Sequence, residues 1–128
     1  MRKLPVLILV LLIAGCGKKE KSYSMEAMIQ DLKDRDPGVR YTAAEMLGGY
    51  GRKAESAVPA LIEALKDKDK NVRMRAAYSL AEILPAAQAA IPALRESLKD
   101  KEQLVREAAA YSLKRIRTKL NLPDADDE

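Results

Sequence analysis

The sequence predicts an all-α protein, a short α-solenoid of about three helix pairs that follows a signal peptide. The first observation is a period of 33 residues in both the apolar and the charged positions. The second is that apolar residues within each period recur at helical spacing. The third is the composition, with five Tyr and no Trp or Phe. A core of aliphatic and small side chains suits closely packed helices better than a β-sandwich.

The N-terminus has the layout of a secretory signal peptide. Arg2 and Lys3 precede an apolar run at 4–13, and the small pair Ala14-Gly15 follows. A basic start, an apolar run and small residues are typical of a cleaved signal. The run is shorter than the roughly 20 residues that a membrane-spanning helix needs. We therefore expect residues 1–15 to be removed.

Cys16, the only cysteine, comes directly after this segment. The stretch Ile13-Ala14-Gly15-Cys16 resembles the bacterial lipobox, which implies a diacylglyceryl thioether on Cys16, formed by its nucleophilic thiolate. Cleavage before Cys16 and acylation of the new amino group, for example by palmitate, are implied too. The resemblance places the protein in the bacterial cell envelope. Because Gly17 and not Asp follows, it favours the periplasmic side of an outer membrane, if the organism has one. The alternative is an ordinary cysteine inside a signal region.

The remaining chain divides into three parts. Residues 16–24 are polar and are predicted to be a lipidated tether. Residues 25–120 contain the repeats and are predicted to form one domain. Residues 121–128 are strongly acidic and are predicted to be a disordered tail.

The repeats are visible in three aligned stretches: LKDRDPGVRYTAAEML, LKDKDKNVRMRAAYSL and LKDKEQLVREAAAYSL. VPALIEAL and IPALRESL, before the second and third stretches, align with the same step. Repeats of about 20–50 residues indicate a solenoid. The alanine pairs at 43/44, 76/77 and 109/110 should let neighbouring helices approach closely.

The middle unit shows why each repeat should be a helix pair. Leu61, Ile62 and Leu65 share one helical face, and Pro59 suits the first turn of a helix. Asp69 is a good N-cap for the next helix, as Asp36 is in the first unit. We predict helices at 25–34, 37–48, 57–67, 70–84, 89–100 and 102–120.

This pattern resembles HEAT repeats, in the bacterial form called phycobilisome-lyase-like. The resemblance covers about residues 25–119 and rests on P-A-L-x-x-x-L in the first helix, an acidic turn, and V-R-x-x-A-A-x-x-L in the second. The first unit departs from it, with Glu26 where Pro59 and Pro92 stand. The resemblance implies a right-handed stack whose second helices line a concave surface.

Three arginines repeat with the same period. The resemblance implies that they pair with acidic turn residues in a structural ladder. A row of anion-binding arginines is the alternative. The expected ladder consists of Asp36, Arg40, Asp69, Arg73, Glu102 and Arg106.

Variable positions of the second helices are the candidates for partner binding. Tyr, Met and Arg are enriched in protein interfaces. Tyr78 and Tyr111 are repeat-equivalent, and the alternative is that their rings pack between units. The predicted partner-binding residues are Tyr41, Met74, Arg75, Tyr78, Tyr111 and Arg115.

No catalytic motif is recognisable in the sequence. It has no His, no phosphate-binding loop and no Ser-His-Asp set. We therefore expect no catalytic residue, no cofactor and no metal site. The mixed charges, with a net +4, and the expected export argue against nucleic-acid binding. The leading interpretation is a membrane-anchored, non-catalytic scaffold for a protein partner. The alternative is a subunit of an enzyme of the bilin-lyase-like HEAT group.

Overall fold

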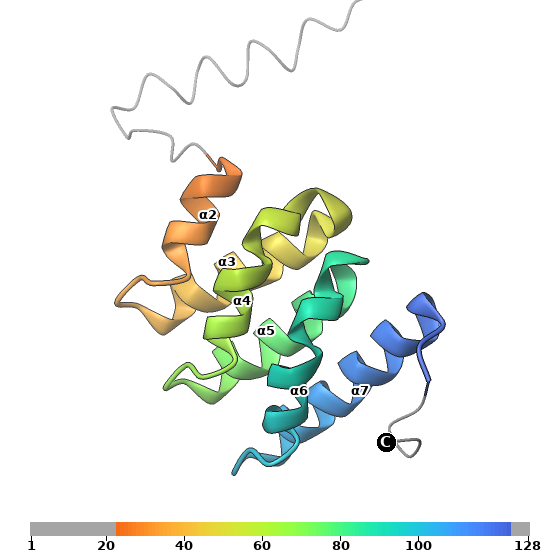
Figure 1. The fold of residues 1–128 in the computed structure, drawn as a ribbon. Coiled ribbons are helices and arrows are strands. Elements are labelled where there is room, and N and C mark those ends of the chain that lie inside the picture. Colours follow the sequence, from red (N-terminus) through yellow and green to blue (C-terminus); the bar gives the residue numbers. More distant parts are fainter. Residues whose placement is uncertain (1–22, 124–128) are drawn as a thin grey trace, which may run out of the picture.

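The computed structural model describes residues 23–123. This part of the chain contains six α-helices, two 3-10 helices and no strand, so the predicted all-α class is confirmed (Figure 1). The α-helices are α2 (Met25–Asp31), α3 (Pro37–Gly49), α4 (Val58–Ala64), α5 (Lys70–Glu82), α6 (Ile91–Ser97) and α7 (Gln103–Leu120). The 3-10 helices are η1 (Gly51–Ala57) and η2 (Ala86–Ala90).

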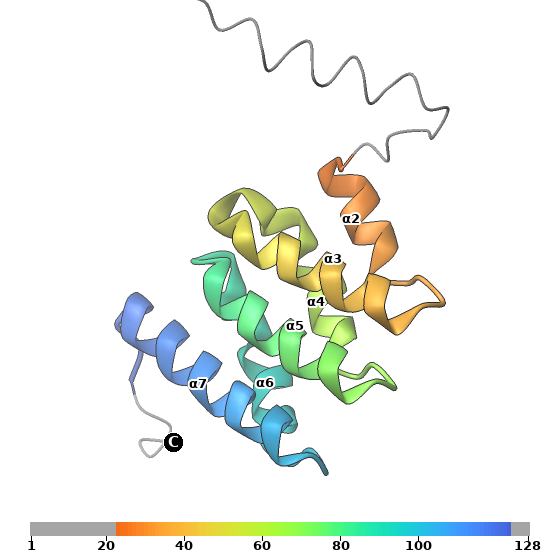
Figure 2. The same ribbon diagram turned by 180° about the vertical axis from the view of Figure 1, so that it is seen from behind.

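The helices form two layers. The first helices of the units, α2, α4 and α6, make one layer, and α3, α5 and α7 lie side by side in the other (Figure 2). Helix α5 packs against both α3 and α7, and each first helix packs against the second helix of its own unit. The predicted α-solenoid of helix pairs is therefore confirmed. No helix within residues 23–123 combines the length and the apolar character needed to cross a membrane.

The second helices match the predicted bounds within two residues, but the first helices end three residues early. In the middle unit the N–H of Lys66 bonds to the carbonyl of Glu63, which closes the helix with a tight turn. An Asp67 carboxylate oxygen then accepts the N–H of Asp69 at 2.8 Å. This side-chain turn offers the backbone a partner outside the helix. The same bonds recur in the other two units.

The predicted helix starts are confirmed where a cap was expected. Asp36 accepts the N–H of Gly38 at 2.8 Å, and Asp69 accepts those of Asn71 and Val72 at 2.8 and 3.1 Å. These bonds satisfy N–H groups that have no partner inside the helix. At the chain's first described helix, Ser24 caps α2 through a bond from Ala27 N–H.

The repeated apolar residues form one core between the layers. Leu47, Leu61, Leu80 and Leu94 are fully buried. Burial falls at the last unit, where Leu98 is 40% exposed although its equivalents Leu32 and Leu65 are buried. Within the described residues no further unit covers this end of the stack. For the same reason Ala110, expected at a helix contact, is exposed, unlike the other five alanines of the pairs.

The arginine ladder exists, but its predicted acidic partners are wrong. Arg40 holds Asp67 of the next unit through Nε and Nη2, at 2.8 and 3.0 Å. Arg73 holds Asp100 in the same way, at 2.9 and 3.1 Å. Asp69 is not available because it caps α5. Each arginine is buried and joins one unit to the next, so the ladder is structural.

The ends of the ladder differ from its middle. Arg106 donates to the carbonyls of Asp100 and Lys101 at 2.7 and 3.1 Å, and no carboxylate within residues 23–123 pairs with it. Glu102, predicted as its partner, lies 4.0 Å from Lys70 Nζ. Asp36 is occupied as the N-cap of α3.

The pKa values of the ladder reflect this geometry. Burial alone would raise the pKa of Asp100, but hydrogen bonds from Arg73 and from the N–H of Glu102, together with nearby positive charge, hold it below its ordinary value of 3.8. The hydrogen bond to Asp67 raises the pKa of Arg40 above its ordinary value. Both shifts show that the charged forms are the stable ones in the fold.

Candidate protein-binding site

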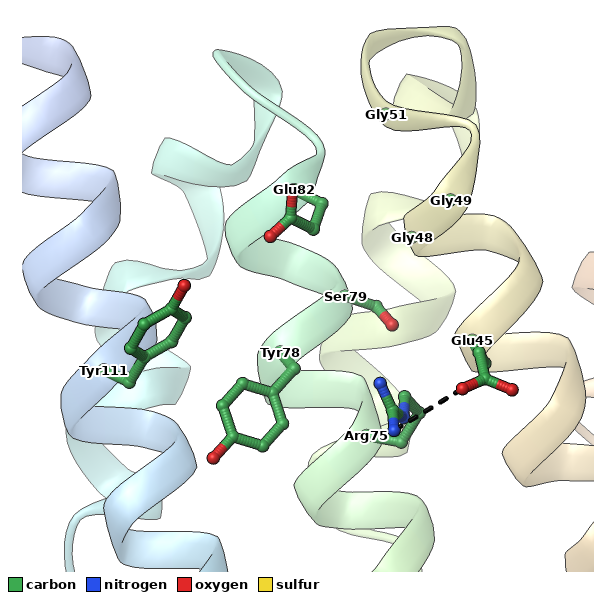
Figure 3. A pocket seen from close by; sticks show the side chains of 9 residues that line it. All are labelled: Glu45, Gly48, Gly49, Gly51, Arg75, Tyr78, Ser79, Glu82 and Tyr111. Atoms are coloured by element: carbon green, nitrogen blue, oxygen red, sulfur yellow. Dashed lines mark ion pairs between the residues drawn. The ribbon is translucent and has the colours of Figure 1, made fainter.

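The layer of second helices carries a groove of about 560 Å³ across the C-terminal halves of α3 and α5 (Figure 3). Tyr111 of α7 closes one side of it. The lining residues are Glu45, Gly48, Gly49, Gly51, Arg75, Tyr78, Ser79, Glu82 and Tyr111. We call this feature the second-helix groove.

Two neighbouring glycines have opposite roles in shaping the groove. Ser79 Oγ donates to the carbonyl of Ala44 at 2.6 Å and holds α5 close to α3. A Cβ at Gly48 would lie 2.8 Å from Ser79 Oγ and 3.0 Å from its Cα, so this contact requires glycine. Apart from its own helix backbone and chain neighbours, a Cβ at Gly49 would meet no atom of the described residues within 4 Å. Gly48 therefore permits the close approach of the helices, and Gly49 leaves the groove open.

This difference predicts opposite effects of the same substitution. Gly49→Ala should raise the free energy of unfolding by up to about 1 kcal/mol, because alanine is the better helix former and space is free. Gly48→Ala should lower it, because the added methyl group presses on the Ser79 backbone. Urea unfolding of both variants checks this. Equal effects of the two substitutions would contradict the described contact.

An aromatic pair lies at the edge of the groove. The rings of Tyr78 and Tyr111 meet edge to face, with centroids 5.5 Å apart and an interplanar angle of 61°. Tyr78 is half-buried and packs against the core, whereas Tyr111 remains 48% exposed. The rings thus contact each other between two units and still line an open surface. The alternative that the rings pack between units therefore describes part of the arrangement, and partner binding by the two tyrosines remains a prediction.

Arg75 joins α5 to α3 beside the groove. Its guanidinium lies over the Tyr41 ring, 5.0 Å from the centroid. Its Nη2 donates to the Tyr41 hydroxyl at 2.6 Å and lies 3.5 Å from Glu45 Oε1. Its Nε is buried and has no hydrogen-bond partner among residues 23–123. Figure 3 shows Arg75 and Glu45 facing each other from the two helices.

The family of the chain follows from comparison with known proteins. A family model for HEAT repeats matches residues 25–114. The chain belongs to the HEAT-repeat family. No curated protein matches its sequence significantly.

Solved structures support the HEAT-repeat fold. A chain in the structure of the complex of CpcE and CpcF of phycocyanin lyase from Nostoc is 33% identical to this protein. The match has a TM-score of 0.69 and covers 79% of this chain. An engineered protein is 24% identical to this chain, and the match has a TM-score of 0.62 and covers 73% of this chain. This similarity supports the fold only. The matches cover 40% and 45% of those chains. This HEAT-repeat chain thus spans less than half the length of each of these two chains.

The HEAT-repeat fold distributes the six predicted partner-binding residues over three neighbouring grooves. Arg75, Tyr78 and Tyr111 line the second-helix groove. Tyr41 and Met74 line a groove of about 540 Å³ at the start of α3 and α5. Arg115 lines a third groove, of about 330 Å³, together with Tyr111, and with Lys114 and Lys119. All six therefore lie on the layer of second helices.

Arg115 also makes a contact between units. Its Nε donates to the carbonyl of Ala81, and its Nη2 pairs with Glu82 Oε2, both at 3.2 Å. Arg115 thus ties α7 to α5 as Arg75 ties α5 to α3. The predicted role of these two arginines in partner binding remains a prediction, but both already have partners inside the fold.

Sequence reasoning did not select the groove's acidic and glycine residues, Glu45, Glu82, Gly48 and Gly49. The two glycines are the last two residues of α3. One signal was present in the sequence, because the other units have Ala81-Glu82 and Lys114-Arg115 where the first has Gly48-Gly49. Cys16 lies outside the described residues, so its lipidation remains a prediction. Residues 23–123 contain no cluster of three or more potential metal ligands.

Proposed function

We propose that this HEAT-repeat protein is a non-catalytic scaffold that binds a protein partner in the second-helix groove. The observation that carries the proposal is the groove itself, an open surface lined by an aromatic pair, an arginine and two carboxylates. Tyr and Arg are enriched in interfaces, and they dominate binding energy when a partner covers them. The buried core and ladder hold these side chains on rigid helices. Such preorganisation lowers the entropic cost of binding.

The second part of the proposal is a lipid anchor at Cys16. The lipobox-like stretch 13–16 supports it, and residues 16–24 would connect the anchor to α2. The scaffold would then hold its partner close to a membrane of the bacterial cell envelope, on the periplasmic side of an outer membrane where one exists. Several acyl chains make such an anchor stable, because each buried CH₂ adds about 0.8 kcal/mol.

The groove is tested by removing both aromatic rings. Tyr78→Ala with Tyr111→Ala should reduce partner recovery in affinity purification. The melting temperature should fall only slightly, since Tyr111 is half exposed and Tyr78 is partly so. A matched control is Tyr23→Ala, because Tyr23 is 63% exposed on another part of the surface. Unchanged recovery with the double variant would reject the groove as the docking site.

The anchor is tested separately. Cys16→Ser removes the only thiol, so the variant should incorporate no radiolabelled palmitate and should accumulate as an uncleaved precursor. The wild-type protein should be labelled and should enter the detergent phase on extraction. Equal labelling of the two proteins would rule out Cys16 as the attachment site.

A second function is supported by the similarity to the phycocyanin lyase complex, at 33% identity. On this alternative the chain is a subunit of a bilin-lyase-like enzyme. The purified protein, alone and with its recovered partner, would then change the visible absorption spectrum of an added open-chain tetrapyrrole. If neither the protein alone nor the protein with its partner changes the spectrum of the tetrapyrrole, the scaffold remains the supported function.

A further inference from the structure

The arginines beside the second-helix groove are already paired within the fold. Arg75 is stacked on Tyr41, bonded to its hydroxyl and close to Glu45. Arg115 is bonded to a backbone carbonyl and to Glu82. Each carboxylate meets its arginine through one oxygen only. Glu45 Oε2 and Glu82 Oε1 accept no hydrogen bond from residues 23–123.

The groove therefore offers two free carboxylate acceptors, one on Glu45 and one on Glu82. The side chains of Glu45 and Glu82 are 53% and 46% exposed, so both reach solvent. Ser79 cannot donate to a ligand without losing its bond to Ala44. Among the charged residues lining the groove, two are acidic and one, Arg75, is basic, and Arg115 pairs with Glu82 from outside this lining.

The helix ends at the groove bear on its charge. Helices α3 and α5 both terminate at the groove, at Gly49 and Glu82, and neither has a basic residue in its last turn. In α5, however, Arg115 of α7 already donates to the last-turn carbonyl of Ala81, so only the end of α3 has no cation beside it among residues 23–123. The C-terminus of a helix carries a partial negative charge that a cation stabilises. In α7, by contrast, Arg117 and Lys119 supply that charge within the helix. A positive group bound in the groove would do the same for α3.

The tyrosines complete a surface suited to a cation. A Lys or Arg side chain is attracted to the face of an aromatic ring, and Tyr111 is half exposed at the groove's edge. The open space at Gly49 leaves room for a long side chain to lie between the two carboxylates. We propose that the second-helix groove takes a lysine or arginine side chain of the protein partner. This inference rests on the proposed function and specifies the partner's chemistry.

The test is a titration of the full-length protein, ¹⁵N-labelled and in detergent micelles, at low salt so that charge effects are not screened. The probes are N-acetyl-lysine amide, N-acetyl-arginine amide and the uncharged N-acetyl-norleucine amide. The backbone amide signals of Gly48, Gly49 and Gly51 report binding. Both cationic probes should shift these signals in a saturable way, and the norleucine probe should bind at least about threefold more weakly.

Charge and shape are separated by three variants. Glu45→Gln with Glu82→Gln keeps the shape and keeps acceptors for both arginines, and should weaken the cationic probes about threefold to tenfold. Glu55→Gln with Glu63→Gln changes the net charge equally on exposed residues outside the groove and should leave them unchanged. Gly49→Leu fills the groove and should abolish the shifts.

The outcomes separate this inference from the proposed function. Equal binding of the norleucine and lysine probes would overturn the inference and leave a docking groove in place. The absence of any shift with the cationic probes would also overturn it, while loss of partner recovery in the tyrosine double variant would still support docking. If the shifts survive Gly49→Leu, the cations bind elsewhere and the inference is wrong.

Discussion

Asp100→Ala is expected to destabilise the protein by about 3–5 kcal/mol in urea unfolding. The substitution leaves Arg73 buried without its carboxylate, and the side chains of this pair are only 8% and 12% exposed. The carbonyls of Asp67 and Lys68 still accept from Arg73, which favours the lower end of the range. The matched control is Glu102→Ala in the same turn. Its half-exposed carboxylate should contribute less than about 1 kcal/mol.

The same pair gives the protein a defined pH dependence. The folded pKa of Asp100 lies below its ordinary value of 3.8, so the unfolded chain binds the proton more readily. The pair's contribution is therefore present above about pH 4 and is lost as the pH falls through the folded pKa. Asp100→Ala should remove part of the acid-induced loss of stability. If Glu102→Ala removed as much, Asp100 would not be the ladder residue.

Leu80→Ala is expected to lower the free energy of unfolding by about 2–5 kcal/mol. Leu80 is fully buried in α5, which packs against helices on both sides. The lost contacts and the remaining cavity should therefore act in the middle of the stack, where relaxation is hardest. Leu104→Ala is the control, because Leu104 is 54% exposed at the start of α7. A cost below about 1 kcal/mol for Leu80→Ala would contradict the described core.

The fold was predictable because three repeats place the same residue types at the same packing positions. Val72, Ala76 and Leu80 recur with the period that stacking requires, and all three are fully buried. The ladder partners were not predictable from the period alone. Asp67 and Asp69 belong to series with the same step. The sequence predicted Asp69 both as an N-cap and as a ladder residue, and only the geometry shows that it serves as the cap while Asp67 faces Arg40.

The groove was less predictable because it depends on departures from the repeat. Gly48 and Gly49 replace larger residues of the other units, and only the structure shows which of them faces Ser79. Glu45 occupies the position equivalent to Tyr78 and Tyr111, so one repeat position supplies both acidic and aromatic lining residues. The residue types predicted binding on the second helices. Their grouping around one opening follows from side-chain directions that a sequence does not state.

The central claim is that a protein partner docks in the second-helix groove, and photocrosslinking in cells tests it most directly. A benzophenone amino acid placed at position 111 should give a discrete adduct with the partner, and Gly49→Leu in the same chain should remove the adduct. The same amino acid at position 63, exposed on α4 in the other layer, should give none. Adducts of equal yield from both positions, or an adduct that Gly49→Leu leaves unchanged, would contradict the account.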